Sequence, residues 1–556
     1  MPTVTRKAAR KKRATVRRTS RQRASVRATK PRKTKPGTPQ PTPPVAGNLP
    51  KVRVRMYRQG LGDCFLLTVN PGGDEKHILI DCGTLGATTT GIKLPDVVAD
   101  IDKTTNGHLH LVVATHQHQD HLSGFPKISD QFSPTKNKRI DRVWLAWTED
   151  PNDQLAKQLG KARDDMAIAV KSAAQALRAT GGDNAAADAV DSLLGFFGDT
   201  SIKLGATGVE GATFAAAAKN SMDLVRGLVA QTEYRNAGEP VIELDWLPGF
   251  RFYILGPPRN IDSIHDTGEP GSSELYALTA LSRAAIQQSD TSKGPGGSVD
   301  ATSEAPFDQR YRLARSDASM LKAYGKTYFA PTEAWRTVDT DWLNGSSALA
   351  IQLDSFTNNT SLAMAIERIA DGKVLLFPGD AQEGNWLSWQ KDAVEQKDSA
   401  GQKITLEWQV KLPDGKSSTV TAKDLLNRTV FYKVGHHSSH NATAKAKGLE
   451  MMTSQSELKA FIPVDRQVAL GRSPAGTWKM PARQLYRALL DKCQGRVMRS
   501  DIGWAANVKA GTKGTEEEFI ALGNDAEWAA WISRNISVAR ADRRQPYRLP
   551  AGVTSR

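Results

Sequence analysis

Hydrophobic residues along this chain either alternate with polar residues or gather in short runs, which is the pattern of strands in a layered sheet. Gly, Pro, Asp and Asn separate many of these runs and predict turns between them. The predicted strands lie at 52–57, 64–69, 77–80, 109–115, 143–147, 244–255, 348–353, 362–366, 374–377, 429–434 and 460–464. Hairpin-linked strands with polar residues at their ends predict a layered α/β fold.

Two insertions interrupt this strand pattern. The segment 151–235 is rich in alanine with helical spacing, whereas 259–340 is rich in Ser, Asp and Gly and is predicted to form mainly loops. The predicted helices lie at 154–180, 212–232, 273–287 and 482–493. We therefore expect one α/β domain at 50–545 that carries a helical insertion and a loop-rich insertion.

Positive charge is concentrated at the N-terminus. The formal net charge is +16, but residues 1–50 hold 15 Lys or Arg and no Asp or Glu, so the remaining chain has 60 basic and 59 acidic residues. The segment 1–49 has no apolar run and is predicted to be a disordered, Pro-rich tail. Three interpretations stay open: a solvated tail, an electrostatic arm at 6–35 that binds nucleic acid or another polyanion, or a transit peptide.

Composition also bounds the cellular setting. The sequence has no run of about 18 apolar residues, so no transmembrane helix is predicted. Cys64, Cys82 and Cys493 cannot form a disulfide framework, which favours a reducing compartment. The two cysteines in predicted strands are expected to be buried. These features predict a soluble cytoplasmic protein.

The strongest chemical signal is the run Thr115-His116-Gln117-His118-Gln119-Asp120-His121 at the end of a predicted strand. A loop that leaves the strand here would direct His116 and His118 to one metal ion. The same turn would direct Asp120 and His121 to a second ion nearby. Nitrogen and oxygen ligands favour Zn²⁺, and Mn²⁺ or Fe would also be accepted. A solvated polar loop is the alternative.

Two later strand ends supply the partners that a two-metal site needs. Asp380 follows an apolar strand and Gly379, and is the candidate bridging carboxylate. His436 and His437 follow another apolar strand, and we favour His436 as the ligand because it comes first. Taken alone, Gly-Asp after a strand usually marks a turn, and an isolated histidine pair is often structural. Together with the histidine run they predict a metal centre.

Short motifs at strand ends follow one another between residues 50 and 510. They are Gln59-Gly60-Leu61-Gly62-Asp63-Cys64, Ile80-Asp81-Cys82-Gly83, the histidine run, Asn358-Asn359-Thr360-Ser361-Leu362, Leu376-Phe377-Pro378-Gly379-Asp380, Lys433-Val434-Gly435-His436-His437 and Val497-Met498-Arg499-Ser500-Asp501. In this order they resemble the metallo-β-lactamase-fold superfamily. More narrowly, they are similar to the hydrolase domain of bacterial DNA-uptake (competence) channels and its soluble relatives. The resemblance implies a four-layer αβ/βα sandwich.

The resemblance also implies a hydrolase that uses metal-activated hydroxide, with a phosphodiester, including one in nucleic acid, as the favoured substrate. Asp120 would orient metal and water, and Asp81 would support the centre from nearby. His440, or the histidine of the pair that does not bind metal, would protonate the leaving group. Two alternatives remain: an ester, thioester or lactam hydrolase on the same site, and a non-catalytic nucleic-acid-binding or scaffold protein.

One position departs from the superfamily pattern. The superfamily usually supplies a third histidine to the first metal before the bridging Asp, whereas this chain has Asn358 to Ser361 in that region. His265 is the unassigned histidine between Asp120 and Asp380, and it lies in the predicted loop-rich insertion. The first metal is therefore expected to be held less firmly than the second.

Overall fold

A computed structural model describes the part of the chain that carries the predicted domain. The described residues are 50–70, 72–179, 193–197, 216–266, 353–472, 478, 480–504 and 547–549. The chain divides into two units, Met1–Val45 and Ala46–Arg556, and all described residues belong to the second. The tail at 1–49, the helix at 273–287 and most of the insertion at 259–340 lie outside the described residues.

Two seven-stranded sheets form the centre of this unit. The first has the order β20 (Tyr547–Leu549), β1 (Val52–Met56), β2 (Cys64–Val69), β3 (Lys76–Cys82), β5 (Leu111–Val113), β7 (Val143–Ala146), β8 (Glu233–Arg235). The second has the order β19 (Gly503–Trp504), β18 (Val497–Arg499), β17 (Lys459–Ile462), β16 (Thr429–Lys433), β11 (Lys373–Phe377), β10 (Ala363–Arg368), β9 (Phe250–Gly256). Three short ribbons pair β4 (His108–Leu109) with β6 (Arg139–Ile140), β12 (Gln396–Lys397) with β13 (Lys403–Ile404), and β14 (Glu407–Lys411) with β15 (Ser417–Thr421).

The main core lies between the two sheets. Side chains of both sheets form one buried apolar cluster, and the rings of Phe65 and Phe377 meet edge to face with their centroids 5.9 Å apart. Every residue of β2 is buried, because one face packs on the second sheet and the other on helices. A strand buried on both faces reads as a continuous apolar run, as the sequence of β2 does.

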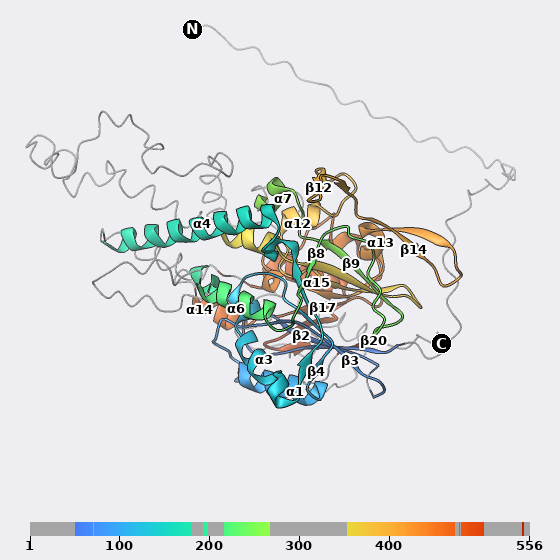
Figure 1. Ribbon diagram of the computed structural model, residues 1–556, viewed down its shortest axis with the longest axis horizontal. Helices are drawn as coiled ribbons and strands as arrows, with labels where there is room; N and C mark the ends of the chain where they lie inside the picture. The colour runs from blue at the N-terminus through green and yellow to red at the C-terminus, as the bar shows by residue number, and fades with distance from the viewer. Residues whose placement is uncertain are drawn as a thin grey trace, which may run out of the picture. The chain divides into compact units, whose positions relative to one another are not determined.

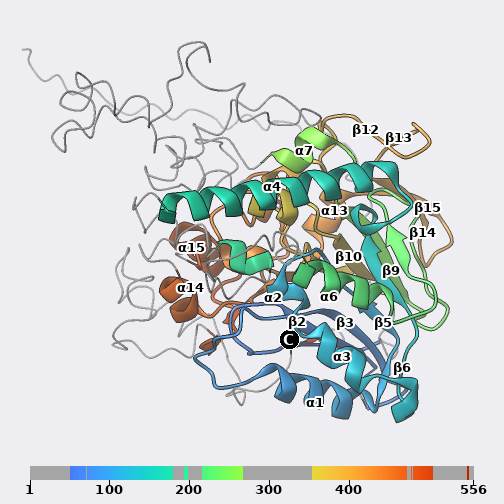
Figure 2. The same ribbon diagram turned by 60° about the vertical axis from the view of Figure 1, so that its left-hand side comes forward.

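Helices cover the outer face of each sheet (Figures 1 and 2). The first sheet packs against α1 (Leu94–Thr105), α2 (Gln119–Leu122), α3 (Phe125–Gln131) and α6 (Ala216–Arg226). The second packs against α12 (Glu383–Leu387), α13 (Ala422–Asn427) and α15 (Arg483–Lys492). The predicted αβ/βα sandwich is confirmed. No described helix is long and apolar enough to span a bilayer.

The remaining helical segments lie at the margins or in connections. They are α4 (Gln154–Ala179), α7 (Ile261–His265), α14 (Arg466–Arg472), a helix at 353–359, and the 3₁₀ turns η1 (Pro134–Lys136), η2 (Trp147–Glu149), η3 (Gly195–Phe197), η7 (His436–Ser438) and η8 (Leu449–Met451). The predicted helices at 154–180 and 212–232 correspond to α4 and, over its described residues, to α6.

Three strand predictions were wrong in detail. The predicted strand at 244–255 begins only at Phe250, because Gly249 turns the chain with a φ of +85°. The predicted strand at 109–115 is interrupted at His110. The described end of the predicted strand at 348–353 belongs to the helix at 353–359, where buried Leu353 and Phe356 have helical spacing.

Parallel strands bring the functional segments together. In the first sheet β3 runs parallel to β5, and in the second β11, β16 and β17 run parallel to one another. Because the carboxyl ends of parallel strands lie at the same edge of a sheet, the segments that follow them become neighbours. These ends carry Asp81, the histidine run, Asp380, the histidine pair and Pro463.

Candidate metal centre

Two glycines place the histidine run against the neighbouring strands. A Cβ at Gly83 would lie 2.3 Å from the carbonyl carbon of Asp120, and one at Gly62 would lie 2.6 Å from the oxygen of that carbonyl. Only glycine allows so close an approach. The backbone N–H of Asp63 donates to the same oxygen at 2.8 Å. The motifs around Gly62 and Gly83 therefore fix the backbone that carries Asp120 and His121.

Four side chains from both sheets converge at this edge. The Nε2 atom of His121 lies 3.1 Å from Asp380 Oδ2 and 3.4 Å from Asp120 Oδ2. His437 Nε2 lies 2.8 Å from Asp120 Oδ2. All four side chains are fully buried. Two carboxylates and two imidazoles that point at one place form a donor set suited to Zn²⁺.

His116 and His118 form the adjoining half of the cluster. His116 Nε2 lies 3.0 Å from His118 Nδ1. Donor atoms of His116, His121 and Asp380 also lie within 4.8 Å of one another. Asp380 therefore belongs to both groups of donor atoms, the one with His116 and the one with Asp120 and His437.

Hydrogen bonds behind the rings orient three of the four imidazoles. His121 Nδ1 lies 2.8 Å from Asp81 Oδ2, and His437 Nδ1 lies 2.6 Å from the carbonyl oxygen of Pro463. His116 Nδ1 lies 3.1 Å from the hydroxyl of Thr115. Asp81 thus sits behind His121, and its carboxylate contacts that ring rather than the convergence point.

A buried lysine neutralises part of the negative charge of the carboxylates in the cluster. The sequence analysis gave this residue no role. Lys433 Nζ donates to Asp380 Oδ1 and to the carbonyl oxygen of Gly379, both at 2.8 Å, and forms an ion pair with Asp63. The backbone N–H of His436 donates to Asp380 Oδ1 at 2.7 Å. Because both donors occupy Oδ1, Asp380 presents only Oδ2 to the centre.

Burial and charge separate the protonation states of the cluster. Burial lowers the pKa of His116 well below its usual range and that of His118 to about 3, so both rings are neutral. Burial alone would also lower the pKa of His121, but Asp380, Asp63 and Asp120 raise it well above its usual value. Burial alone would raise the pKa of Asp380, but Lys433 and His121 hold it well below its ordinary value.

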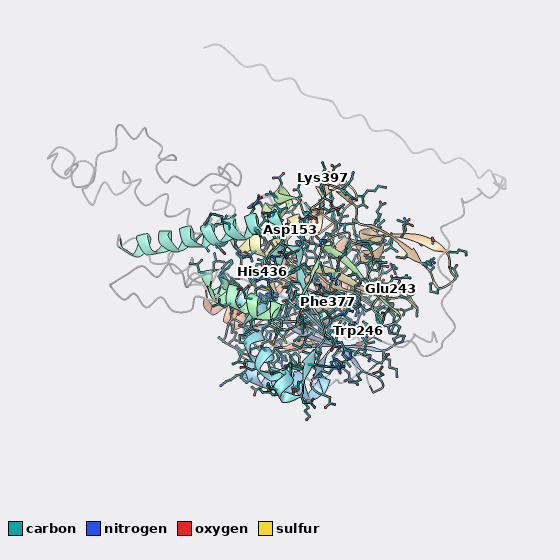
Figure 3. All side chains as sticks on the ribbon, viewed as in Figure 1. Asp153, Glu243, Trp246, Phe377, Lys397 and His436 are labelled. Carbon is teal, nitrogen blue, oxygen red and sulfur yellow. The ribbon has the colours of Figure 1, made fainter. Side chains whose placement is uncertain are left out.

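The structure brings His437 to the cluster, not the favoured His436. Residues 436, 437 and 438 all have positive φ, at 39°, 50° and 65°, so the backbone turns sharply after the strand. This turn directs the ring of His437 to Asp120, whereas His436 Nδ1 lies 2.8 Å from the hydroxyl of Ser439. Figure 3 shows His436 on the side of α4 and α6, with Phe377 nearer the middle of the view.

Two other histidines of the sequence analysis belong to none of the groups of described residues that could hold a metal. Burial and nearby His436 lower the pKa of His440 to about 4, so its ring is uncharged near pH 7. Its role as proton donor stays a prediction. The ring of His265 lies against Phe356, with centroids 4.9 Å apart, and His265 belongs to no described cluster that could hold a metal.

The short segment η3 of the helical insertion covers one side of the cluster. The ring of Phe197 meets His118 edge to face at 4.8 Å, and Phe196 stacks on Trp478 at 4.9 Å. Phe196 and Phe197 are both buried. The segment η3 therefore forms an apolar wall over the His118 side of the centre.

Comparison with known proteins supports the same family for one part of the chain. No curated protein matches the chain. The family model described as the metallo-beta-lactamase superfamily matches residues 57–183, which include the histidine run but neither Asp380 nor His437. Residues 57–183 are therefore similar to the metallo-beta-lactamase superfamily, and the second sheet of the sandwich is built from strands that follow the matched stretch.

Proposed function

We propose that the protein is a metal-dependent hydrolase with two divalent cations, preferably Zn²⁺, and that it acts on phosphodiesters. The observation that carries the proposal is the convergence of Asp120, His121, Asp380 and His437 from three separate segments of the chain. The residues fit a cation, because Asp120 Oδ1 is buried without a hydrogen-bond partner among the described residues. A buried carboxylate oxygen without a partner is costly unless a cation or water satisfies it.

We propose that one ion is held by Asp120, His121 and His437, the other by His116 and His118, and that Asp380 joins the two. When bound, such ions lower the pKa of water towards about 7 and polarise the bond to be cleaved. The protein fixes the rest of the arrangement. Asp81, Thr115 and the Pro463 carbonyl hold three rings in position from behind.

The remaining residues prepare the site for hydrolysis. Lys433 and the His436 N–H hold one oxygen of Asp380, so its other oxygen stays in place during the reaction. Asp120, as a ligand of one ion, would also orient the water beside it. His440 is the candidate proton donor to the leaving group from the sequence, and because its pKa is lowered to about 4 this role would require acidic pH. Burial of the cluster keeps bulk water away, which strengthens each of these electrostatic contacts.

The phosphodiester substrate rests on two supports from the sequence. The strand-end motifs resemble those of hydrolase domains attached to DNA-uptake channels, and the N-terminal 50 residues carry 15 basic side chains and no acidic one. A basic arm at 6–35 would raise the local concentration of a polyanionic substrate.

The test is a set of hydrolysis assays with metal-loaded protein. Single-stranded DNA, RNA and a chromogenic phosphodiester are compared with carboxylic ester, thioester and lactam substrates. Asp120→Asn is expected to abolish phosphodiester turnover, whereas Asp392→Asn, the same change at an exposed carboxylate, leaves it intact. Turnover of esters or lactams alone would replace the substrate class. No turnover of any substrate by protein shown to hold metal would refute the hydrolase.

A further inference from the structure

The two nitrogens of a metal-binding imidazole have complementary tasks. A ring nitrogen that binds a cation must offer a lone pair, so in the neutral ring the other nitrogen carries the proton and needs an acceptor. Such acceptors are usually carboxylates or backbone carbonyls, and their loss weakens metal binding about 10–100-fold. The acceptors of His116, His121 and His437 are the Thr115 hydroxyl, Asp81 and the Pro463 carbonyl.

His118 is the one imidazole of the four whose second ring nitrogen has no acceptor among the described residues. Its Nδ1 atom faces His116 Nε2 at 3.0 Å, so its proton belongs on Nε2 if both rings bind one cation. His118 Nε2 is buried and has no hydrogen-bond partner among the described residues. The nearest carboxylate oxygen that faces it is Asp354 Oδ1, at 3.8 Å.

Asp354 is equally incomplete on its side. It lies in the helix at 353–359 and is 5% exposed. Asn358, one helical turn later, donates to Asp354 Oδ2 at 3.0 Å, and His436 Nε2 lies 3.7 Å from the same oxygen. Oδ1 has no hydrogen-bond partner among the described residues. A buried donor and a buried acceptor, both unsatisfied, thus face each other.

We propose that Asp354 is the positioning residue of His118: its Oδ1 accepts the Nε2 proton, so that Nδ1 is directed at the ion shared with His116. The inference rests on the proposed metal centre and deepens it. Asn358 holds the carboxylate by its other oxygen and leaves Oδ1 for the histidine. A gap of 3.8 Å closes to a hydrogen bond with a shift of about 1 Å in either side chain. Among the described histidines only His116 and His118 are assigned to this ion, so the orientation of His118 carries more of the binding.

The test measures cobalt binding by the full-length protein. Wild type is expected to bind two equivalents of Co²⁺. Asp354→Leu, which has similar size but no acceptor, is expected to bind one ion as before and the other about 10–100-fold more weakly, with a changed visible spectrum. Asp354→Glu keeps a carboxylate and is expected to restore most of the lost affinity. Asp392→Leu removes an exposed carboxylate and serves as the matched control.

The outcomes separate this inference from the proposed function. If wild type binds two ions and Asp354→Leu binds them with the affinity and spectrum of the control, the inference is overturned and the metal centre stands. If wild type binds no metal, both are overturned. A second measurement does not depend on whether Asp354→Leu folds. It records the ¹⁵N chemical shifts of the His118 ring in Zn²⁺-loaded wild type, and the signals that are missing in His118→Gln assign them. A proton on Nε2 supports the inference, and a metal on Nε2 contradicts it.

Discussion

Lys433 offers a sharp test of how this buried site is stabilised. Its side chain is 2% exposed, and its ammonium group is surrounded by Asp63, Asp380 and the Gly379 carbonyl. Lys433→Met keeps most of the volume but removes the charge. Two buried carboxylates then lose their cation, and removing one partner of a buried ion pair typically costs about 3–5 kcal/mol. We expect the metal-free protein to lose stability in that range.

Most of this loss should come from Asp63. Without the lysine, Asp380 still has His121 Nε2 as a partner at 3.1 Å. The imidazole nitrogen nearest to Asp63 is His121 Nδ1, at 3.8 Å. Burial already raises the pKa of Asp63 to about 6 although Lys433 opposes the rise. Adding Asp63→Asn to Lys433→Met should therefore recover about 0.5–3 kcal/mol, which is the range of coupling between residues in contact.

The assay is urea unfolding of metal-free protein, followed by tryptophan fluorescence and circular dichroism, with the free energy used only where both transitions coincide. Lys447→Met is the matched control, because Lys447 forms an exposed ion pair with Asp392 and should contribute less than about 1 kcal/mol. A loss below about 1 kcal/mol for Lys433→Met, or no recovery in the double variant, would refute the reasoning.

Three further changes test other parts of the structure. His437→Ala should lose one bound metal ion, measured by elemental analysis, whereas His436→Ala should retain the ion at Asp120. The reverse result would make His436 the ligand, as the sequence analysis favoured. Burial lowers the pKa of His77 from 6.5 to about 4 in the folded protein. As the pH falls below 6.5, His77 is protonated in the unfolded chain but not in the folded one. The protein therefore loses stability between pH 6.5 and 4. His77→Gln should flatten this loss by about 1–3 kcal/mol in denaturation at pH 7, 5.5 and 4. Gly83→Ala forces a Cβ to within 2.3 Å of a backbone carbonyl and should cost about 1–3 kcal/mol, unlike Gly471→Ala, which has open space.

The sequence predicted those parts of the site that are local. The histidine run and Asp380 each follow an apolar strand, so their placement at strand ends could be inferred from the pattern of hydrophobic residues. Asp63, Lys433 and Asp354 take their roles from long-range contacts. Asp63 had the appearance of a turn residue, and Asp354 falls just after a segment predicted as a strand. No periodicity reveals such partners.

The choice within the histidine pair had a different difficulty. Adjacent residues on a regular strand point to opposite faces, so only one histidine of the pair was expected to face the metal. The sequence analysis favoured His436 because it comes first after the strand. The positive φ angles at residues 436–438 remove that regularity. These are non-glycine residues in a conformation that L-residues rarely adopt, and the contacts of the site hold them there. Backbone of this kind is set by the surrounding fold, so its outcome could not be read from composition or spacing.

The charges of the centre lead to a last prediction about how many ions it holds. Asp63, Asp81, Asp120, Asp354 and Asp380 are all at least 95% buried, and Lys433 is the lysine that contacts two of them. If metal binding ionises all five carboxylates and the imidazoles are neutral, the net charge is about −4, which two divalent ions balance and one does not; without metal, burial holds the pKa of Asp354 well above its ordinary value.

In metal-free protein, protons take part of that role, because neighbouring carboxylates outweigh burial and raise the pKa values of His121 and His437. Metal binding must therefore release protons, and the affinity should rise with pH. Calorimetric titration with Zn²⁺ in buffers of different ionisation enthalpy measures both the stoichiometry and the protons released. Two equivalents with proton release agree with the charge balance, whereas one tight equivalent and no dependence on pH between 6 and 8 would contradict it.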